Sequence, residues 1–511
     1  MTPEQLLEFN EWKAETNRTH RQNAMQISKR AHYLRTMSLA KKFQNEEAIY
    51  FPHQLDWRGR AYPIPLYLTP QGSDIQRGLL QFADGGEIQD QIAADWLAIH
   101  GAGCFGFDKA SLEDRVSWVQ EHQEEILACA AAPYSSHFWE QADKPWQFLA
   151  FCFDWAGFCE EGFGYVSHIP VQMDGTCNGL QNFSAMLLDE VGGAAVNLVP
   201  SDKPSDIYNS VAKIVAEMVA ADIHSDDPIT VKGHDDDGKE VETMLCTKGE
   251  LAQGWHGQVN RSVCKRPVMT LAYGAKKFGF SGQVEEDTLK PWRQNNPETY
   301  PFIRKEDGKK DYDYGFKASI YLAGLIWEAV GQVVVAARAA MDWLQGMAQA
   351  VSKENLPINW TTPTGLLVQQ AYRVPVLKRI DTTFNSTRIR LTVNLDQDAG
   401  KIDSRRQAAG ISPNWVHSLD ASHLARTIER AHQAGIRNFS MIHDSYGTHA
   451  ANTGALALFL REEFVRMYSE MDVLDQFRSD LQVQTGTSLP ATPAKGKLDL
   501  EQVLESAFFF A

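Results

Sequence analysis

The stretch SMIHDSYGT, residues 440–448, places a histidine and a carboxylate between two short runs of strand-forming residues. Residues 440–442 and 446–448 are typical of β-strands, so the His-Asp-Ser tripeptide lies where one strand turns into the next. A carboxylate is costly in an apolar core, but it is a ligand that hard divalent cations prefer. We therefore predict a hairpin with Asp444 as a candidate metal ligand, against the simpler alternative of a turn residue.

A second carboxylate follows another predicted strand, in YVSHIPVQMDGTCNGLQNFS at residues 165–184. Residues 165–173 suit a strand, Asp174 ends it, and Gly175 lets the backbone approach a ligand closely. If the two strands are neighbours, Asp174 and Asp444 could hold two Mg²⁺ ions about 3.5–4 Å apart, as in-line phosphoryl transfer requires. Mg²⁺ suits such a pair because it binds one or two carboxylates plus substrate phosphates and water. Taken alone, each aspartate also fits a turn or a helix cap.

The third stretch is VNRSVCKRPVMTLAYG, residues 259–274. In a helix, four of its side chains lie four residues apart and share one face: Arg261, Lys265, Met269 and Tyr273. Two cations can bind a triphosphate, and an aromatic ring can stack on a base or contact a sugar. Pro267 would kink such a helix. The alternative is an amphipathic helix with a basic edge.

Three further motifs have weaker implications. DWRGR (56–60) puts a glycine between two arginines, which suits contact with phosphates but also suits a solvated turn. PNWVHSLDASH (413–423) contains His417 and His423, whose spacing of six is poor for two zinc ligands on one helix. GAGCFG (101–106) matches a dinucleotide-binding pattern but lacks a preceding strand, so we discount it.

Composition limits the class of protein. The chain has 511 residues, 43% of them apolar, which is ample for a core and favours more than one domain. Its net charge of −16 does not by itself favour nucleic acid, but residues 11–42 hold eight Lys or Arg against two Glu. No run of about 18 apolar residues occurs, so we expect no membrane span. Seven scattered cysteines without a CxxC motif favour a reducing cytoplasm.

Hydrophobic patterning indicates an α+β protein without the regular alternation of a doubly wound sheet. We expect helix at 2–47, a mostly helical aromatic module at 84–164, and an exposed loop or hairpin at 223–250. Residues 315–352 are apolar and helical, hence buried, and residues 358–395 alternate as strands of one long hairpin.

Taken together and in order, DWRGR, DGTCNGLQ, RSVCKRPVMTLAYG, PNWVHSLDASHL and IHDSYGT resemble the motifs of bacteriophage-type single-subunit DNA-dependent RNA polymerases. The resemblance covers essentially the whole chain. It implies a right-hand polymerase fold, mainly helical with an antiparallel palm sheet, comprising palm, fingers and a residual thumb. The implied segments are thumb 1–46, palm 47–84, a palm insertion 85–164, palm with the first aspartate 165–190, fingers 191–417 and C-terminal palm 418–511.

The resemblance also implies roles for single residues. Asp174, the Gly175 carbonyl and Asp444 resemble the ligands of two Mg²⁺ ions. The other implied contacts are Arg261 and Lys265 with the triphosphate, Lys265 as general acid, Tyr273 with the ribose, His417 with the 2′-hydroxyl and Arg60 with the template–product hybrid. The hairpin at 371–403 resembles a promoter-reading loop, in which Arg379, Asp381 and Arg390 are candidates for contacts with base edges.

The resemblance implies template-directed ribonucleotide transfer, with a DNA template, an RNA product and ribonucleoside triphosphates as partners, in the host cytoplasm if phage-encoded. Related DNA polymerases carry a bulky Glu where this chain has Gly179, so the glycine favours ribonucleotides, and Gly179→Glu should reduce ribonucleotide use preferentially. The alternatives are a family A-like DNA polymerase and a catalytically silent DNA-binding relic.

The chain departs from the family pattern in two ways. Asn182 stands where a histidine is usual, and Asn178 replaces a smaller residue. Family members also carry several hundred residues before the point that matches residue 1. The expected explanations are that the open reading frame is a fragment, that a separate chain supplies the N-terminal domain, or that the protein initiates in another way.

Overall fold

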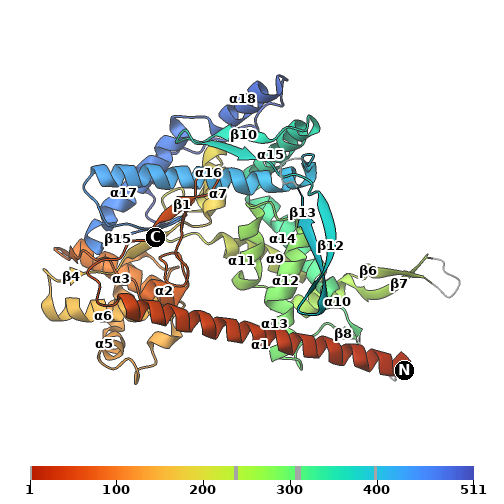
Figure 1. Cartoon of the computed structure of the whole chain (residues 1–511), viewed down its shortest axis with the longest axis horizontal. Coiled ribbons are helices and arrows are strands. Elements are labelled where there is room, and N and C mark those ends of the chain that lie inside the picture. Colours follow the sequence, from red (N-terminus) through yellow and green to blue (C-terminus); the bar gives the residue numbers. More distant parts are fainter. Residues whose placement is uncertain (1–2, 235–239, 305–311, 396–399, 511) are drawn as a thin grey trace. The chain divides into compact units, whose positions relative to one another are not determined.

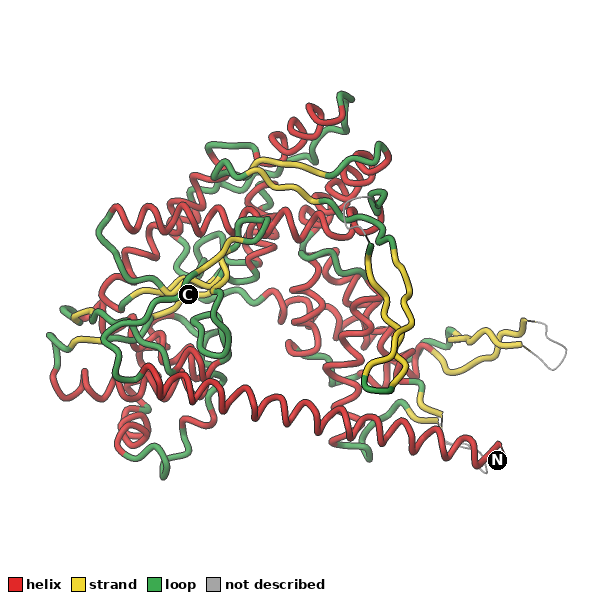
Figure 2. Tube along the Cα trace, viewed as in Figure 1, coloured by secondary structure: helices red, strands yellow, loops and turns green. Residues whose placement is uncertain are grey.

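The computed structural model describes residues 3–234, 240–304, 312–395 and 400–510. They form a mixture of helices and small sheets (Figures 1 and 2), and the strand pairs whose residue register is defined are all antiparallel. The chain divides into two compact units. The first comprises Met1–Asp56, Ala61–Met173 and Ala431–Ala457; the second comprises Trp57–Arg60, Asp174–Arg430 and Leu458–Ala511. The mixed helical and antiparallel class agrees with the sequence prediction.

The first unit begins with the long helix that the sequence predicts, α1 (Pro3–Phe43), drawn in red in Figure 1. Its other elements are β1 (His53–Leu55), β2 (Ala61–Pro63), α2 (Asp74–Gly78), β3 (Gly86–Glu87), α3 (Gln91–Phe105), α4 (Leu112–Glu121), α5 (Gln123–Ala131), η1 (Trp139–Gln141), α6 (Pro145–Glu161), β4 (Val166–Ser167), β5 (Val171–Asp174), β14 (Ser440–Ile442), β15 (Ser445–Thr448) and the start of α17 (Ala450–Ser469).

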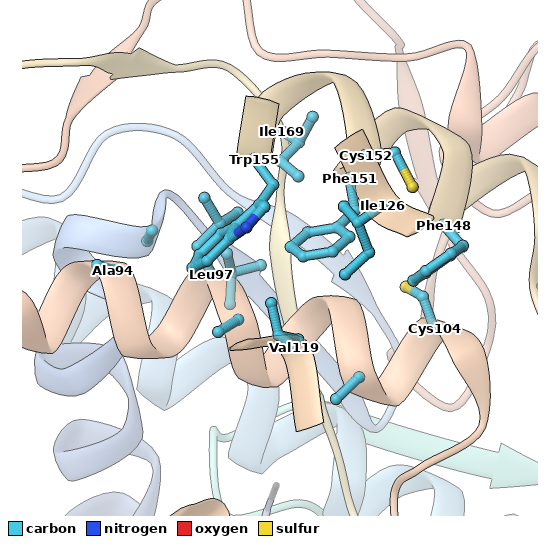
Figure 3. Close-up of a cluster of buried hydrophobic side chains, with 14 of the residues drawn as sticks. Ala94, Leu97, Cys104, Val119, Ile126, Phe148, Phe151, Cys152, Trp155 and Ile169 are labelled. Atoms are coloured by element: carbon cyan, nitrogen blue, oxygen red, sulfur yellow. The ribbon is translucent and has the colours of Figure 1, made fainter. Parts of the chain in front are cut away.

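Helices α3 to α6 form the predicted aromatic module around one apolar core (Figure 3). Phe148 and Phe151 of α6 are fully buried there, and burying each such side chain contributes about 1.5–3 kcal/mol. A Cβ at Gly101 of α3 would lie 2.3 Å from the Phe151 ring, so this glycine permits close packing of two helices. The GAGCFG motif therefore has a packing role, in agreement with its rejection as a dinucleotide site.

A three-stranded sheet with the order β14-β15-β5 contains both strands that the sequence analysis singled out. The expected single strand at 165–173 is wrong, because the structure divides it into β4 and β5. Pro170 lies at the break, where it lacks an N–H for strand pairing, and β4 pairs with β3 in a different sheet.

The second unit is mainly helical. Its elements are α7 (Asn178–Leu187), α8 (Glu190–Ala195), α9 (Ile207–Asp222), β6 (Pro228–His234), β7 (Glu240–Thr247), α10 (Lys248–Trp255), α11 (Arg261–Leu271), α12 (Lys277–Val284), η2 (Glu285–Leu289), α13 (Lys290–Asn295), β8 (Ile303–Arg304), β9 (Tyr312–Asp313), α14 (Gly315–Val333), α15 (Val335–Lys353), β10 (Ile358–Thr361), β11 (Leu367–Gln370), β12 (Leu377–Phe384), β13 (Thr387–Asn394), most of α16 (Ser404–Gln433), the rest of α17, α18 (Val473–Thr485) and α19 (Gln502–Glu505).

Three expectations for this unit can be compared with the structure. Residues 223–250 contain the hairpin β6–β7, with residues 235–239 outside the described part. The apolar stretch at 315–352 is helical and largely buried, but it forms two helices, α14 and α15, bent by 103°. Within the described residues, no single helix has the length and apolarity to cross a membrane, although this bent pair passes the same test jointly.

The expected single long hairpin at 358–395 is wrong, because the structure has two hairpins, β10–β11 and β12–β13. The first closes through the turn at 362–366, where Gly365 adopts a φ of +83°. Pro375 lies between the two hairpins and cannot donate to a strand ladder. Alternating residues thus predicted the strands correctly but not their partners.

Candidate functional site

The hairpin that opened the sequence analysis is confirmed. Strands β14 and β15 pair in the register Ser440↔Gly447 to Ile442↔Ser445, which leaves His443 and Asp444 as a two-residue turn. His443 has a φ of +53°, as one position of a tight hairpin turn requires, and Asp444 is half-buried. The centroids of the His443 and Tyr62 rings lie 4.7 Å apart, so the imidazole packs on the side of the turn that faces Tyr62.

Asp174 is the last residue of β5 and is exposed, whereas Met173 before it is buried. A Cβ at Gly175 would lie 2.9 Å from the Phe510 ring, and these two residues form an isolated backbone bridge. Packing of the C-terminal segment therefore accounts for the glycine without a ligand. The role of the Gly175 carbonyl as a metal ligand stays a prediction.

The acidic residues fit a metal site in which substrate and water supply some of the ligands, rather than a site made of protein ligands alone. Among the described residues, no group of three or more His, Cys, Asp or Glu side chains is arranged to hold a cation unaided. A Mg²⁺ site built from one or two carboxylates, with substrate and water as the remaining ligands, needs no such group. Asp174 and Asp444 are oxygen ligands of that kind: Asp174 ends β5, and Asp444 lies in the turn between β14 and β15 of the same sheet.

Helix α11 carries the predicted cations. Lys265 is exposed, and Arg261 is half-buried with its Nε donating to Asp206 Oδ2 at 2.6 Å. Asp206 also caps the first turn of α9, so the acidic cap holds the guanidinium in place. Tyr273 does not lie on the helix as expected, because α11 ends at Leu271 and Tyr273 belongs to the following turn.

The second unit places Tyr273 against His417, with ring centroids 5.0 Å apart. His417, on α16, receives a hydrogen bond at its Nδ1 from Arg58 Nη1, at 2.6 Å. Because arginine can only donate, Nδ1 must be the acceptor and the ring proton of neutral His417 lies on Nε2. Asn414 Oδ1 also accepts from Arg58 Nη1 at 3.3 Å, which fixes the guanidinium.

Gly179 is crowded rather than open. A Cβ at this position would lie 2.6 Å from the Ala272 Cβ and 3.7 Å from the Tyr273 ring. The expectation that Gly179 leaves space for a 2′-hydroxyl must therefore be revised, because a neighbouring methyl group already fills it. A side chain there would displace the turn that carries Tyr273 before reaching a ribose.

Arg60 lies in a buried network. Its guanidinium binds both carboxylate oxygens of Asp420, and Asn178 Nδ2 donates to the same carboxylate at 3.3 Å. Asn182 Nδ2 donates to Asn178 Oδ1 at 2.8 Å, and Asn182 Oδ1 accepts from the Tyr468 hydroxyl, so the two departures from the family pattern are partners. With 9% of its surface exposed, Arg60 is poorly disposed to contact nucleic acid, and that role stays a prediction.

The hairpin β12–β13 carries the predicted base-contacting residues on one exposed face. Asp381 lies directly opposite Arg390, and Arg390 Nε donates to Asp381 Oδ1 at 2.8 Å. Arg379 lies two residues away on the same strand and face. Arg388, which was not predicted from sequence, pairs with Asp381 at 3.5 Å and shares this face. Alternation along β13 could have revealed it.

Tyr208 adds to the surroundings of α11. The Arg261 guanidinium lies 5.4 Å from the centre of the Tyr208 ring, a cation–π contact. Burial, and secondly the neighbouring Cys177 side chain, raise the pKa of Tyr208, so its hydroxyl remains protonated. Tyr208 was not singled out from sequence, and Arg58 was noted only as one of the two arginines of DWRGR, because the partners of both residues are distant along the chain.

Comparison with known proteins gives a consistent result. Residues 88–489 match the family model described as DNA-dependent RNA polymerase. The DNA-directed RNA polymerase of Enterobacteria phage T3 is 41% identical over 98% of this chain, and the T7 RNA polymerase of Escherichia phage T7 is 40% identical over all of it. The mitochondrial DNA-directed RNA polymerase 1 of Arabidopsis thaliana is 34% identical over 98%. The chain spans 58% of the length of each phage relative.

Proposed function

The chain belongs to the DNA-dependent RNA polymerase family, and from this premise we propose that it extends RNA on a DNA template by ribonucleotidyl transfer. In this reaction the 3′-hydroxyl of the RNA attacks the α-phosphate of a ribonucleoside triphosphate, and pyrophosphate leaves. The observation that carries the proposal is the sheet order β14-β15-β5, which joins the strand ending at Asp174 to the hairpin with Asp444 in its turn.

The two aspartates would hold the divalent cations that this family uses, which we propose are two Mg²⁺ ions. When bound, they would supply Lewis-acid stabilisation of the charge that develops on the phosphates. The carboxylates of Asp174 and Asp444 would bind these ions and hold them in position. The Gly175 carbonyl, next to Asp174, would be a further oxygen ligand.

The positive groups of α11 would receive the triphosphate. Lys265 is exposed, and it would contact phosphate oxygens and donate a proton to the departing pyrophosphate. Arg261, held at its Nε by Asp206, presents the rest of its guanidinium in a fixed orientation. A guanidinium fixed in advance loses less conformational entropy when it binds an anion.

Tyr273 and His417 would contact the ribose. The His417 tautomer set by Arg58 makes Nε2 a donor, which suits the oxygen of a 2′-hydroxyl. The Tyr273 ring beside it adds an apolar face and a hydroxyl. This pair favours ribonucleotides by hydrogen bonding.

The wider assignment follows the family. We propose that the segments 47–84, 165–190 and 418–511 form the palm, with the insertion 85–164, that 191–417 form the fingers, and that 1–46 belong to the thumb. Within the fingers, Arg379, Asp381 and Arg390 of β12–β13 would contact promoter bases. The seven cysteines are free thiols, as in a protein of the host cytoplasm.

Primer extension tests the proposal without promoter opening. Purified protein receives an RNA primer annealed to a DNA template, Mg²⁺ and ribonucleotides, and elongated RNA is the expected product. Asp444→Asn should abolish elongation while leaving the melting temperature near that of the parent. The matched control is Asp108→Asn, an exposed carboxylate paired with Lys109 outside this site, which should extend normally.

The possible outcomes separate the alternatives. Preferential use of deoxyribonucleotides would favour a DNA polymerase. Binding of the primer–template without any extension would favour a silent DNA-binding protein, and extension by Asp444→Asn equal to the parent would refute the proposed role of that carboxylate.

A further inference from the structure

Gln172, in β5, makes side-chain hydrogen bonds to both strands of the hairpin β14–β15. Its Nε2 donates to Ser440 Oγ of β14 at 2.8 Å. Its Oε1 accepts from Ser445 Oγ of β15 at 3.3 Å. One amide therefore links all three strands of the sheet, in the order β14-β15-β5.

This link requires a glycine in the middle strand. Gly447 of β15 pairs in register with Ser440, and a Cβ at Gly447 would lie 2.9 Å from Gln172 Cγ. The stem of the glutamine thus passes directly over the glycine on its way from β5 to β14. A larger residue at 447 would block the path.

The rest of the first unit holds this glutamine in place. An Nη2 of Arg77 donates to the same Oε1, so the amide oxygen must face the arginine and its NH₂ must face Ser440. The backbone N–H of Gln172 donates to His100 Nδ1 of α3 at 3.3 Å. Because β5 is an edge strand of the sheet, this contact satisfies a donor that no fourth strand would pair.

The location of the contacts gives them significance. Gln172 lies two residues before Asp174 on the same face of a four-residue strand, and Ser445 directly follows Asp444. A slip of one residue between two strands turns every side chain of the shifted strand to the opposite face. A side-chain clamp across such strands fixes which way the strand-end carboxylates point.

We propose that Gln172 is a positioning residue, which holds the strand ending at Asp174 in register with the hairpin carrying Asp444 and so sets the affinity of these aspartates for divalent cations. The inference rests on the proposed function. Gln172 touches neither substrate nor cation; it acts through Ser440, Ser445 and the strand itself.

The test compares two identical substitutions. Gln172→Met keeps the length of the side chain and removes both hydrogen bonds to the hairpin. Gln147→Met is the matched control, since Gln147 is equally half-buried and lines the same cavity beside Arg77. Its amide donates to Asp74 instead, away from the sheet. Mn²⁺ binding, followed by electron paramagnetic resonance without nucleotide, and melting temperature are measured for both variants.

We expect Gln172→Met to weaken Mn²⁺ binding about tenfold, the lower range for residues that support metal ligands, and to raise the Mg²⁺ needed for half-maximal extension similarly. Gln147→Met should lower the melting temperature comparably and leave Mn²⁺ binding unchanged. Ser440→Ala, which removes one of the two links, should fall between. Equal cation affinity in the two methionine variants would overturn the inference. If the parent protein binds Mn²⁺ but does not extend a primer, the proposed function fails while the positioning role is still measured.

Discussion

The contact between Gly179 and Ala272 predicts that one added methyl group will impair catalysis more than folding. In the structure, a Cβ at 179 would lie 2.6 Å from the Ala272 Cβ, whereas ordinary van der Waals contacts begin at 3.4 Å. Ala272 follows the last residue of α11 and directly precedes Tyr273. Gly179→Ala must therefore push α7 and the Tyr273 turn apart.

The size of the effect follows from two opposing terms and one displacement. Alanine in place of a helical glycine gains about 1 kcal/mol in helix propensity, while overpacking costs about 1–3 kcal/mol. The net loss of stability is thus about 0–2 kcal/mol. Relief of the contact needs a shift of about 0.8 Å, from 2.6 to 3.4 Å, and a misplacement of about 1 Å at a reacting centre can reduce rates about a hundredfold.

The assay is single-nucleotide primer extension with ribonucleotides and deoxyribonucleotides in parallel. We expect Gly179→Ala to reduce kcat/KM for both by about 10- to 100-fold, because Tyr273 moves for both. Gly179→Glu should behave likewise, without a selective loss of ribonucleotide use. The double variant Gly179→Ala with Ala272→Gly removes the opposing methyl group and should recover most of the activity. Full activity in Gly179→Ala, or no recovery in the double variant, would refute this reasoning.

Three further predictions concern other contacts. Arg58→Met removes the donor that fixes the His417 tautomer, and should lower the ratio of kcat/KM for ribo- over deoxyribonucleotides about tenfold; a constant ratio would contradict it. Asp381→Asn releases Arg390 from its carboxylate and should change preference among promoter variants in run-off transcription, whereas an unchanged preference would remove this hairpin from promoter reading. Burial lowers the pKa of His423 to about 4 in the folded protein. Below pH 6.5 the unfolded chain therefore binds a proton that the folded chain does not, and the free energy of unfolding decreases as the pH is lowered. Between pH 7 and pH 5 this should cost about 2 kcal/mol in urea unfolding, and His423→Gln should show a smaller loss.

Local signals were sufficient where neighbouring residues decide the structure. Alternation and turn residues predicted the hairpin at 440–448. Its second strand, β15, starts at Ser445, one residue earlier than predicted. The helix expected at 2–47 is α1, which spans Pro3–Phe43. In each case the deciding contacts lie within a few residues along the chain.

Sequence was insufficient where a distant partner decides. Nothing near residue 58 shows that Arg58 meets His417, 359 positions away. The pairing of Asn178 with Asn182 was visible in principle, because residues four apart share a helix face. Their common link to Asp420 was not, since it depends on how α7 and α16 pack.

The glycines show most clearly what a sequence pattern leaves open. At 175 and 179, small residues beside a candidate site suggested room for a ligand, yet the structure fills that room with Phe510 and Ala272. At 447, the Gln172 stem fills it. A glycine records a close approach without identifying the neighbour, and here each neighbour is protein. We therefore propose that ribose recognition depends on hydrogen bonds from the Tyr273 and His417 side chains and not on an empty volume beside residue 179.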